Sequence, residues 1–354
     1  MSTDFSSPMG IQGFGFVEFA SSEPEQLRNL FRNIGFRPVG KHPTKDITIF
    51  RQGDINFLVN AEDGGHAAKF TDTHGPCASS MALRFSDPHA AFKLAVERGA
   101  KPLSPADSAL DHDFPAVEGI GGAPLYFIND PAAGRPGFET AFEVNEEAAS
   151  HCYGFGFHTL DHLTHNVYRG RLNHWAQFYE RIFDFYEIRY FDIKGKKTGL
   201  HSRAMSSRDG SVRIPLNEES ELGGGQIDEY LEEYNGEGIQ HIALACDDLY
   251  ACCEQLKLCG TNFMPPPPTT YYEMLEDRLP GHGEPVDKLQ QTGILVDGST
   301  DRGPKLLLQI FSENSVGPIF FEFIQRKQDE GFGEGNFTAL FESIERDQIN
   351  RGVI

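Results

Sequence analysis

Hydrophobic and polar positions alternate along this chain in short segments, most of which have the spacing of strands or amphipathic helices. In the first half, strand-like segments cover residues 14–19, 47–51, 55–60, 80–85 and 125–128, and helical segments cover 23–33 and 88–98. In the second half, strand-like segments cover residues 160–167, 212–215, 239–245, 306–311 and 319–325, and helical segments cover 172–182 and 248–257. This mixture predicts an α+β fold.

An internal echo indicates that the plan occurs twice. The segment SMALRFSDPHAAFKLAVERGA resembles HIALACDDLYACCEQLKLCG, and GGAPLYFIND resembles VGPIFFEFIQ, in the same order. Such self-similarity is typical of duplicated modules. The polar, acidic stretch 139–150 separates the two halves, so we predict one domain over residues 1–150 and another over residues 151–354. The proline-rich stretch FMPPPPTTYYEML between two late segments predicts a loop.

Composition and charge narrow the classes of partner. The formal net charge of −21, from 31 basic and 52 acidic residues, repels nucleic acid and anionic lipid, so we expect neither as a partner. The sequence has no apolar run long enough to span a membrane, and its beginning does not have the pattern of a signal peptide. The six cysteines do not form a disulfide or zinc pattern, which favours buried free thiols in a reducing cytoplasm.

Two histidines and one glutamate stand on separate strand-like segments of the second half. They are His162 in LDHLTHNV, His241 in GIQHIAL and Glu322 in FFEFI. A carboxylate with apolar neighbours on both strand faces costs several kcal/mol unless it is paired or bound to a metal. Two imidazoles and one carboxylate that meet on one side of a metal form the ligand set of non-haem Fe(II) oxygenases. The pattern therefore suggests an iron site.

The residues alone leave alternatives open for each of these three side chains. Glu322 also fits a salt-bridge partner, and His241, which strand alternation places on one face with Ile239 and Ala243, also fits an ordinary core histidine. Alternation places His165 opposite His162, so only one of the two faces the cleft. The histidines that compete with His162 are His158, His165, His174 and His201.

Around these residues the sequence resembles the 4-hydroxyphenylpyruvate dioxygenase family in its bacterial form. The similarity is densest in DHLTHNVYRGRL, FYERIFDFYEIRYFDIKGKKTGL, RIPLNEES, EYNGEGIQHIAL, TYYEML, LLLQIF, FFEFIQRK and GFGEGNFTALFESIERDQ. The resemblance implies the vicinal oxygen chelate fold, in which paired βαβββ modules form two open barrel domains, followed by a C-terminal helix. That helix is expected to cover about residues 336–350 and to gate the site.

The resemblance also implies which residues work in the site. Fe(II) would be held by His162, His241 and Glu322. The N-terminal domain would be structural and free of metal, with Ser80 or Met81 in place of His241 and Ile128 in place of Glu322. The implied catalytic polar residues are Ser202, Asn217, Gln240 and Gln309. The implied substrate-binding residues are Pro215, Gln226, Phe311, Phe320, Phe332, Asn336, Phe337 and Phe341.

The reaction implied by this resemblance is the conversion of 4-hydroxyphenylpyruvate and O2 to homogentisate and CO2 in tyrosine catabolism. A homo-oligomer is implied as well, with a tetramer favoured over a dimer. Three other functions fit parts of the pattern: 4-hydroxymandelate synthase with the same metal and substrate, an extradiol ring-cleaving dioxygenase, and a drug-sequestering binding protein of the same superfamily. The last does not need three metal ligands, so the complete set argues against it.

Overall fold

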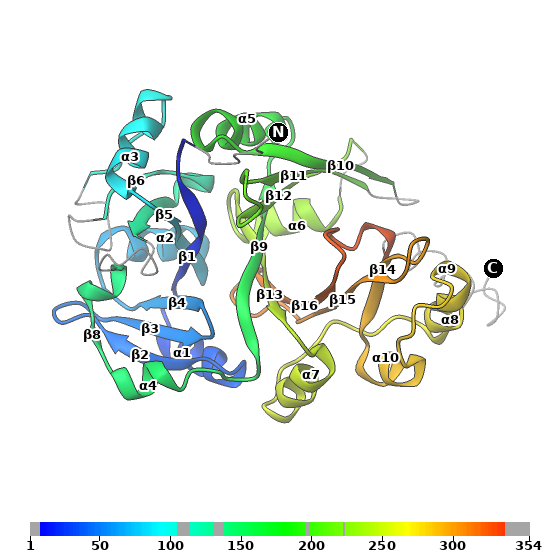
Figure 1. Ribbon diagram of the computed structural model, residues 1–354. Helices are drawn as coiled ribbons and strands as arrows, with labels where there is room; N and C mark the ends of the chain where they lie inside the picture. Colours follow the sequence, from blue (N-terminus) through cyan, green and yellow to red (C-terminus); the bar gives the residue numbers. More distant parts are fainter. Residues whose placement is uncertain (1–7, 105–113, 130–136, 195–198, 222–223, 337–354) are drawn as a thin grey trace.

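Two curled, mixed sheets of eight strands each form the body of the protein (Figure 1). The computed structural model describes residues 8–104, 114–129, 137–194, 199–221 and 224–336. The strand order is β6-β7-β5-β1-β4-β3-β2-β8 in the first sheet and β10-β11-β12-β9-β13-β16-β15-β14 in the second. The two sheets therefore follow chain order, one in each half of the sequence.

The bounds of the elements are as follows. The first sheet contains β1 (Ile11–Ala20), β2 (Arg37–Lys41), β3 (Ile47–Gln52), β4 (Ile55–Asn60), β5 (Cys77–Phe85), β6 (Ala116–Glu118), β7 (Pro124–Asn129) and β8 (Glu143–Val144). The second contains β9 (Phe157–Val167), β10 (Tyr186–Lys194), β11 (Gly199–Ser206), β12 (Arg213–Glu219), β13 (Gly238–Cys246), β14 (Leu295–Ser299), β15 (Lys305–Phe311) and β16 (Phe320–Lys327). The α-helices are α1 (Pro24–Asn33), α2 (Gly65–His74), α3 (Pro88–Glu97), α4 (Glu146–Ser150), α5 (Leu172–Phe183), α6 (Gln226–Glu233), α7 (Leu249–Leu258), α8 (Thr269–Glu273), α9 (Leu275–Arg278) and α10 (Val286–Thr292).

Each sheet is built from two copies of one unit, which confirms the predicted duplication. In every unit the first strand lies parallel to the last: β1 to β4, β5 to β7, β9 to β12 and β13 to β16. The first strands of two units then pair antiparallel at the centre of the sheet, β1 with β5 and β9 with β13. Three units show the full βαβββ order, and the described part of the unit that begins with β5 shows βαββ. All strands and helices predicted above within the described residues are present.

The register corrects one sequence-based alignment. The aspartates that cap α3 and α7 each follow an alanine of the preceding strand by five residues, which makes Ala82 and Ala243 counterparts. Ala243 lies opposite Glu322 and Ala82 lies opposite Tyr126. Tyr126, rather than Ile128, is therefore the counterpart of Glu322. Matching GGAPLYFIND to VGPIFFEFIQ at their prolines, Pro124 and Pro318, shifts the pairing of these positions by two residues.

Aromatic rings occupy the part of the first sheet that corresponds to the predicted metal site. Phe16 is the counterpart of His162, since these residues lie opposite Ala82 and Ala243. The rings of Phe16 and Tyr126 are 5.7 Å apart, and both side chains are buried. These rings lack metal-binding nitrogens and carboxylates, so this face of the first sheet packs as a core.

The two halves of the protein pack against each other through aromatic rings. The ring of Phe57 lies 6.0 Å from that of Phe321, and the ring of Phe127 lies 5.8 Å from that of Phe183.

The stretch 139–150 is structured: β8 pairs with β2, and α4 packs on the same strand. It therefore extends the first sheet, and the boundary near residue 150 stays a prediction.

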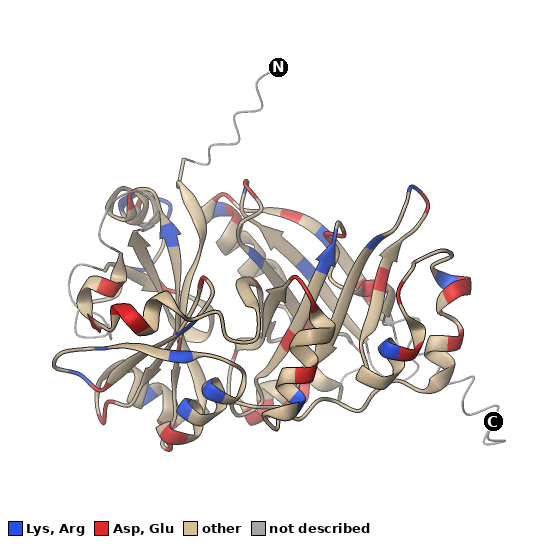
Figure 2. Cartoon of the chain, turned by 60° about the horizontal axis from the view of Figure 1, so that its bottom comes forward, with Lys and Arg blue, Asp and Glu red and all other residues tan. Residues whose placement is uncertain are grey.

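Acidic and basic residues are interspersed along the helices, strands and loops drawn in Figure 2. Among the described residues no helix is long and apolar enough to cross a membrane. The six cysteines are free; five are buried as expected, whereas Cys259 is exposed at the end of α7, which the sequence did not predict.

Candidate metal centre

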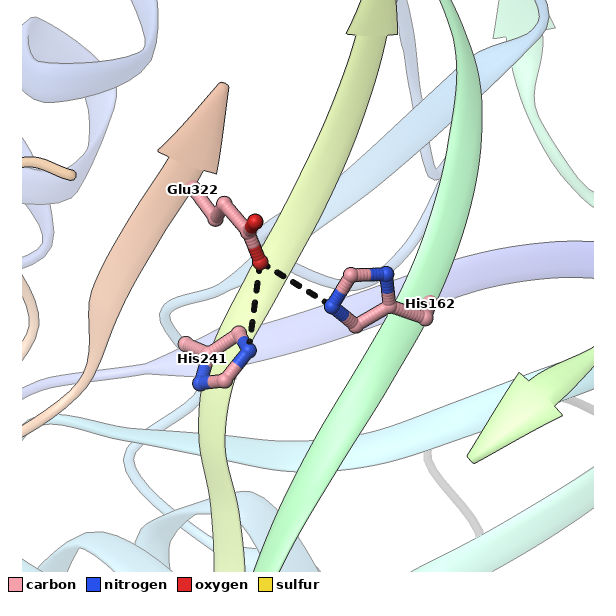
Figure 3. Close-up of side chains that lie close together, drawn as sticks. All are labelled: His162, His241 and Glu322. Atoms are coloured by element: carbon pink, nitrogen blue, oxygen red, sulfur yellow. Dashed lines mark ion pairs between the residues drawn. The ribbon is translucent and has the colours of Figure 1, made fainter. Parts of the chain in front are cut away.

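Three side chains from neighbouring strands converge on the inner face of the second sheet (Figure 3). His162 projects from β9, His241 from β13 and Glu322 from β16. Glu322 Oε2 lies 3.0 Å from His162 Nε2 and 3.4 Å from His241 Nε2. One ligand atom from each residue lies within 4.8 Å of the other two, close enough for all three to bind one metal ion.

Sheet register explains why these three residues meet. Ala243 of β13 lies opposite both His162 of β9 and Glu322 of β16, so these two side chains flank β13 on the same face. His241 stands two residues before Ala243 and points to the same face. Residues far apart in the sequence therefore meet because their strands are adjacent.

A β-bulge gives His241 an orienting partner. The register skips Gln240, so Ile239 lies opposite His165 while His241 lies opposite the next residue, Thr164. Ile239 therefore does not share the face of His241, contrary to simple alternation. The bulge brings Gln240 Oε1 to 2.8 Å from His241 Nδ1, while His241 Nε2 lies 2.9 Å from the Thr164 hydroxyl and 3.4 Å from Glu322 Oε2. Gln240 is thus placed to orient the histidine, which is a positioning role.

His162 is oriented by an acidic neighbour. Its Nδ1 lies 2.8 Å from Asp161 Oδ1, and its Nε2 points to Glu322. A carboxylate on the far nitrogen fixes the ring of a metal-binding histidine and increases its basicity. Asp161 in turn accepts two hydrogen bonds of 2.7 Å from Arg326.

Glu322 is held on its second oxygen by an amide chain. Gln309 Nε2 donates to Glu322 Oε1 at 2.7 Å and to the Phe332 carbonyl at 3.3 Å. Gln309 Oε1 accepts from Asn336 Nδ2 at 2.7 Å. A Cβ on Gly333 would lie 1.9 Å from Gln309 Oε1, so this close approach requires glycine. Glu322 Oε2 remains directed at the two histidines.

The electrostatics favour a cation between these groups. Burial opposes ionisation of Glu322, but His162 and His241 hold the pKa of its carboxyl below its usual range. Burial also opposes protonation of His162, but Glu322 and Asp161 raise the pKa of this imidazole. Burial lowers the pKa of His241, with Glu322 opposing. A metal ion bound between these groups would compete with any proton on the imidazoles, so metal affinity should depend on pH.

The competing histidines do not join the cluster. His165 points to the helical side of β9, where its Nε2 lies 2.9 Å from the Tyr179 hydroxyl, and burial lowers the pKa of its imidazole to about 3. His158 lies 3.4 Å from Asp247 at the surface. His174 is exposed on α5, and His201 lies 3.5 Å from Asp192.

Three predicted pocket residues share a sheet face with the cluster. Ser202 of β11 lies opposite Asn217 of β12, and Asn217 lies opposite Asn166 of β9. Asn166 stands four residues after His162, on the same face of that strand. Pro215 stands two residues before Asn217 and faces the same side. This polar row therefore lies on the inner face of the sheet, further along β9 from the metal ligands.

Aromatic rings border the cluster. Phe320 stacks on the ring of His241 at 4.9 Å, and Phe311 meets Phe320 edge-on at 6.1 Å. The ring centroids of Phe332 and His162 lie 5.4 Å apart.

Gln226, at the first residue of α6, is exposed and is not among the buried polar groups of the site. Phe337, Phe341 and the predicted gating helix lie outside the described residues.

Two family models match the chain. One, described as hydroxyphenylpyruvate dioxygenase, N-terminal, matches residues 5–143, and the glyoxalase/bleomycin resistance protein/dioxygenase superfamily model matches residues 159–285. The 4-hydroxyphenylpyruvate dioxygenase of Pseudomonas sp. (strain P.J. 874) is 54% identical over 351 residues, which are 99% of this chain and 98% of that protein. The chain belongs to the 4-hydroxyphenylpyruvate dioxygenase family.

A further relative agrees with this assignment, and one solved structure shares the fold. The 4-hydroxyphenylpyruvate dioxygenase of Legionella pneumophila (strain Corby) is 47% identical over 348 residues, which are 98% of each chain. The solved structure of a mutant 4-hydroxymandelate synthase from Streptomyces coelicolor matches with a TM-score of 0.78 and 24% identity, over 96% of this chain and 99% of that one. The second likeness shows the fold alone.

Two charged residues near the site were not predicted from the sequence. Asp161 and Arg326 are 165 residues apart, yet they form a buried ion pair directly behind His162. The available signals were the Asp-His dipeptide and the spacing of Arg326, four residues after Glu322 on the same strand face. Both signals are common elsewhere, so only the structure identifies the pair.

Replacing Gln309 with methionine is expected to weaken metal binding and substrate turnover by about 10–100-fold, as is usual for loss of a partner behind a ligand. The substitution leaves Glu322 Oε1 and Asn336 Nδ2 without the bonds described above. Metal titration and steady-state kinetics measure both effects. Asn60→Leu is the control, since Asn60 is also a buried amide and its side chain donates to Glu18 in the first sheet. An equal loss in both variants would mean that only folding stability is affected.

Proposed function

We propose that this chain is a 4-hydroxyphenylpyruvate dioxygenase that converts 4-hydroxyphenylpyruvate and O2 to homogentisate and CO2. The metal would be Fe(II), held by His162, His241 and Glu322. The observation that carries the proposal is the convergence of these three side chains from three adjacent strands, with Glu322 Oε2 at 3.0 and 3.4 Å from the two imidazoles. Full-length identity to relatives of that name supports the same reaction.

The donor set fits the proposed metal. Imidazole and carboxylate ligands suit Fe(II), and three protein ligands leave room for an α-keto acid and O2. Bound iron would supply the oxidising chemistry, while the protein supplies orientation and a dry pocket. Among the described residues, these three are the ones that bring three ligand atoms together in this way.

The remaining side chains have tasks that follow from their positions. Asp161 and Gln240 each engage Nδ1 of a histidine, so both Nε2 atoms point at one centre. Phe311 and Phe320 form an apolar wall beside that centre, which suits an aromatic ring and excludes water. Ser202 and Asn217 offer neutral hydrogen-bonding groups farther along the sheet, where we place the phenol.

Reconstitution with Fe(II) under anaerobic conditions tests the proposal. On addition of O2 and 4-hydroxyphenylpyruvate, we expect one O2 consumed for each CO2 released, with homogentisate as the product. The gas balance alone does not exclude 4-hydroxymandelate, which is an isomer of homogentisate with the same mass, so the product itself must be identified by chromatography against both authentic compounds and by its fragmentation in mass spectrometry. Formation of 4-hydroxymandelate alone would reject the proposed reaction, and O2 uptake with catechols instead of the keto acid would indicate ring cleavage.

Three further parts of the proposal rest on the family. The first sheet is assigned a structural role, which the Phe16–Tyr126 pair in place of metal ligands supports. The oligomeric state, for which a tetramer is favoured over a dimer, and a cytoplasmic location stay predictions. Analytical ultracentrifugation of the purified chain measures the oligomeric state directly.

A further inference from the structure

The guanidinium of Arg326 contacts two separate parts of the site at once. Its Nε and Nη2 donate to the two oxygens of Asp161, each at 2.7 Å. Its Nη1 donates to the main-chain carbonyls of Asp329 at 3.1 Å and Gly331 at 2.7 Å. The side chain is 12% exposed, and that of Asp161 is 7% exposed. A planar fork with fixed donors suits four acceptors in such an arrangement.

The two contacted parts both reach the metal ligand His162. Asp161 engages His162 Nδ1 at 2.8 Å, and the turn 328–331 leads into Phe332, whose ring meets that of His162 at 5.4 Å. The guanidinium carbon also lies 5.9 Å from the Phe332 ring. Arg326 thus stands behind a histidine that is fixed on one side by a carboxylate and covered on another by an aromatic ring.

The turn itself depends on support from outside. Gln328 has a φ of +68°, a left-handed conformation that non-glycine residues adopt only when their surroundings impose it. Within the turn, the amide of Gly331 bonds to the Asp329 side chain. The carbonyls of Asp329 and Gly331 point instead to Arg326. Arg213 adds a weaker link, since it lies 3.5 Å from Asp161 and pairs with the exposed Glu330.

We propose that Arg326 is a positioning residue that couples the orientation of His162 to the placement of Phe332, so that the metal ligand and the aromatic cover are set together. The inference rests on the proposed metal site and adds a residue to it. Loss of the fork frees Asp161 to rotate, which relaxes His162, and at the same time releases the turn that carries Phe332. Loss of Asp161 alone releases His162 but leaves the two bonds from Arg326 to the turn.

Co(II) titration and hydrogen exchange of peptide 328–336 test this coupling in the full chain. For Arg326→Met, we expect the Co(II) dissociation constant to rise about 10–100-fold, exchange in the turn to accelerate, and KM for 4-hydroxyphenylpyruvate to increase. For Asp161→Asn, we expect a similar loss of Co(II) affinity with exchange in the turn unchanged. Arg51→Met is the matched control, because Arg51 is similarly buried and paired with Glu139 in the first sheet; both readouts should match the wild type.

Two outcomes overturn the coupling: wild-type Co(II) affinity in Arg326→Met, or weakened affinity while exchange in the turn is unchanged. If Arg326→Met does not fold, Arg326→Lys decides in its place, since one ammonium keeps the charge but cannot bridge Asp161 and both carbonyls. Faster exchange in the turn together with weaker Co(II) binding supports the proposal, and wild-type values in both overturn it. Wild-type protein that binds no Co(II) would instead refute the metal site on which the inference rests.

Discussion

Replacing Glu322 with glutamine is expected to abolish metal binding and reduce turnover by more than about 100-fold, beyond the usual effect of losing a residue behind a ligand. The carboxylate is 2% exposed and lies between two imidazoles. The substitution keeps the size of the side chain and the contact with Gln309, but it removes the negative charge that attracts the cation. Metal content after anaerobic Fe(II) loading and O2 uptake with 4-hydroxyphenylpyruvate measure the loss.

Thermal unfolding separates this effect from a folding defect. A metal ion that binds only the folded state stabilises it by about 2.7 kcal/mol at a concentration 100 times its dissociation constant. We expect added Fe(II) to raise the melting temperature of the wild type but not that of Glu322→Gln. Glu18→Gln is the matched control, because Glu18 is 1% exposed and accepts hydrogen bonds from Asn60 and Ser80 in the first sheet. A metal-dependent shift of wild-type size in Glu322→Gln would remove Glu322 from the ligand set.

The fold was predictable where a strand or helix buries a regular apolar face. The apolar spacing of α5, for example, follows its buried residues Trp175, Tyr179 and Ile182. By contrast, β10 was missed, because it lies at the edge of the second sheet and its tyrosines Tyr186 and Tyr190 are exposed. Edge strands with polar and exposed positions lack the apolar face that alternation detects.

The candidate ligands were visible in the sequence because each is a polar residue within an apolar strand. Their orientation was not, since it depends on register. The bulge at Gln240 reverses the face of Ile239 relative to His241 and brings the Gln240 amide to the imidazole. Similarly, the alignment of Ile128 with Glu322 failed by two residues because the strand pairing, and not the shared proline, sets the register. A single extra residue in a strand changes which side chains meet.

Alanine substitutions at His162 and His165 should separate a metal ligand from a structural histidine on the same strand. The two are three residues apart and both fully buried, with 3% and 0% exposure. His162→Ala removes the nitrogen that lies 3.0 Å from Glu322, so we expect metal binding and turnover to disappear. Metal-free His162→Ala also leaves the Glu322 carboxylate with one imidazole instead of two.

His165→Ala should instead reduce stability while keeping the metal. The substitution leaves the Tyr179 hydroxyl without its 2.9 Å partner, at a cost of about 1–3 kcal/mol, and creates a cavity beside α5. Metal affinity should stay within a few-fold of the wild type, which is the order expected for a residue that touches no ligand. Denaturant unfolding and Fe(II) titration of both variants measure the contrast. If His165→Ala lost the metal and His162→Ala kept it, β9 would present its other face to the iron, and the pairing of His162 with Glu322 would have no functional meaning.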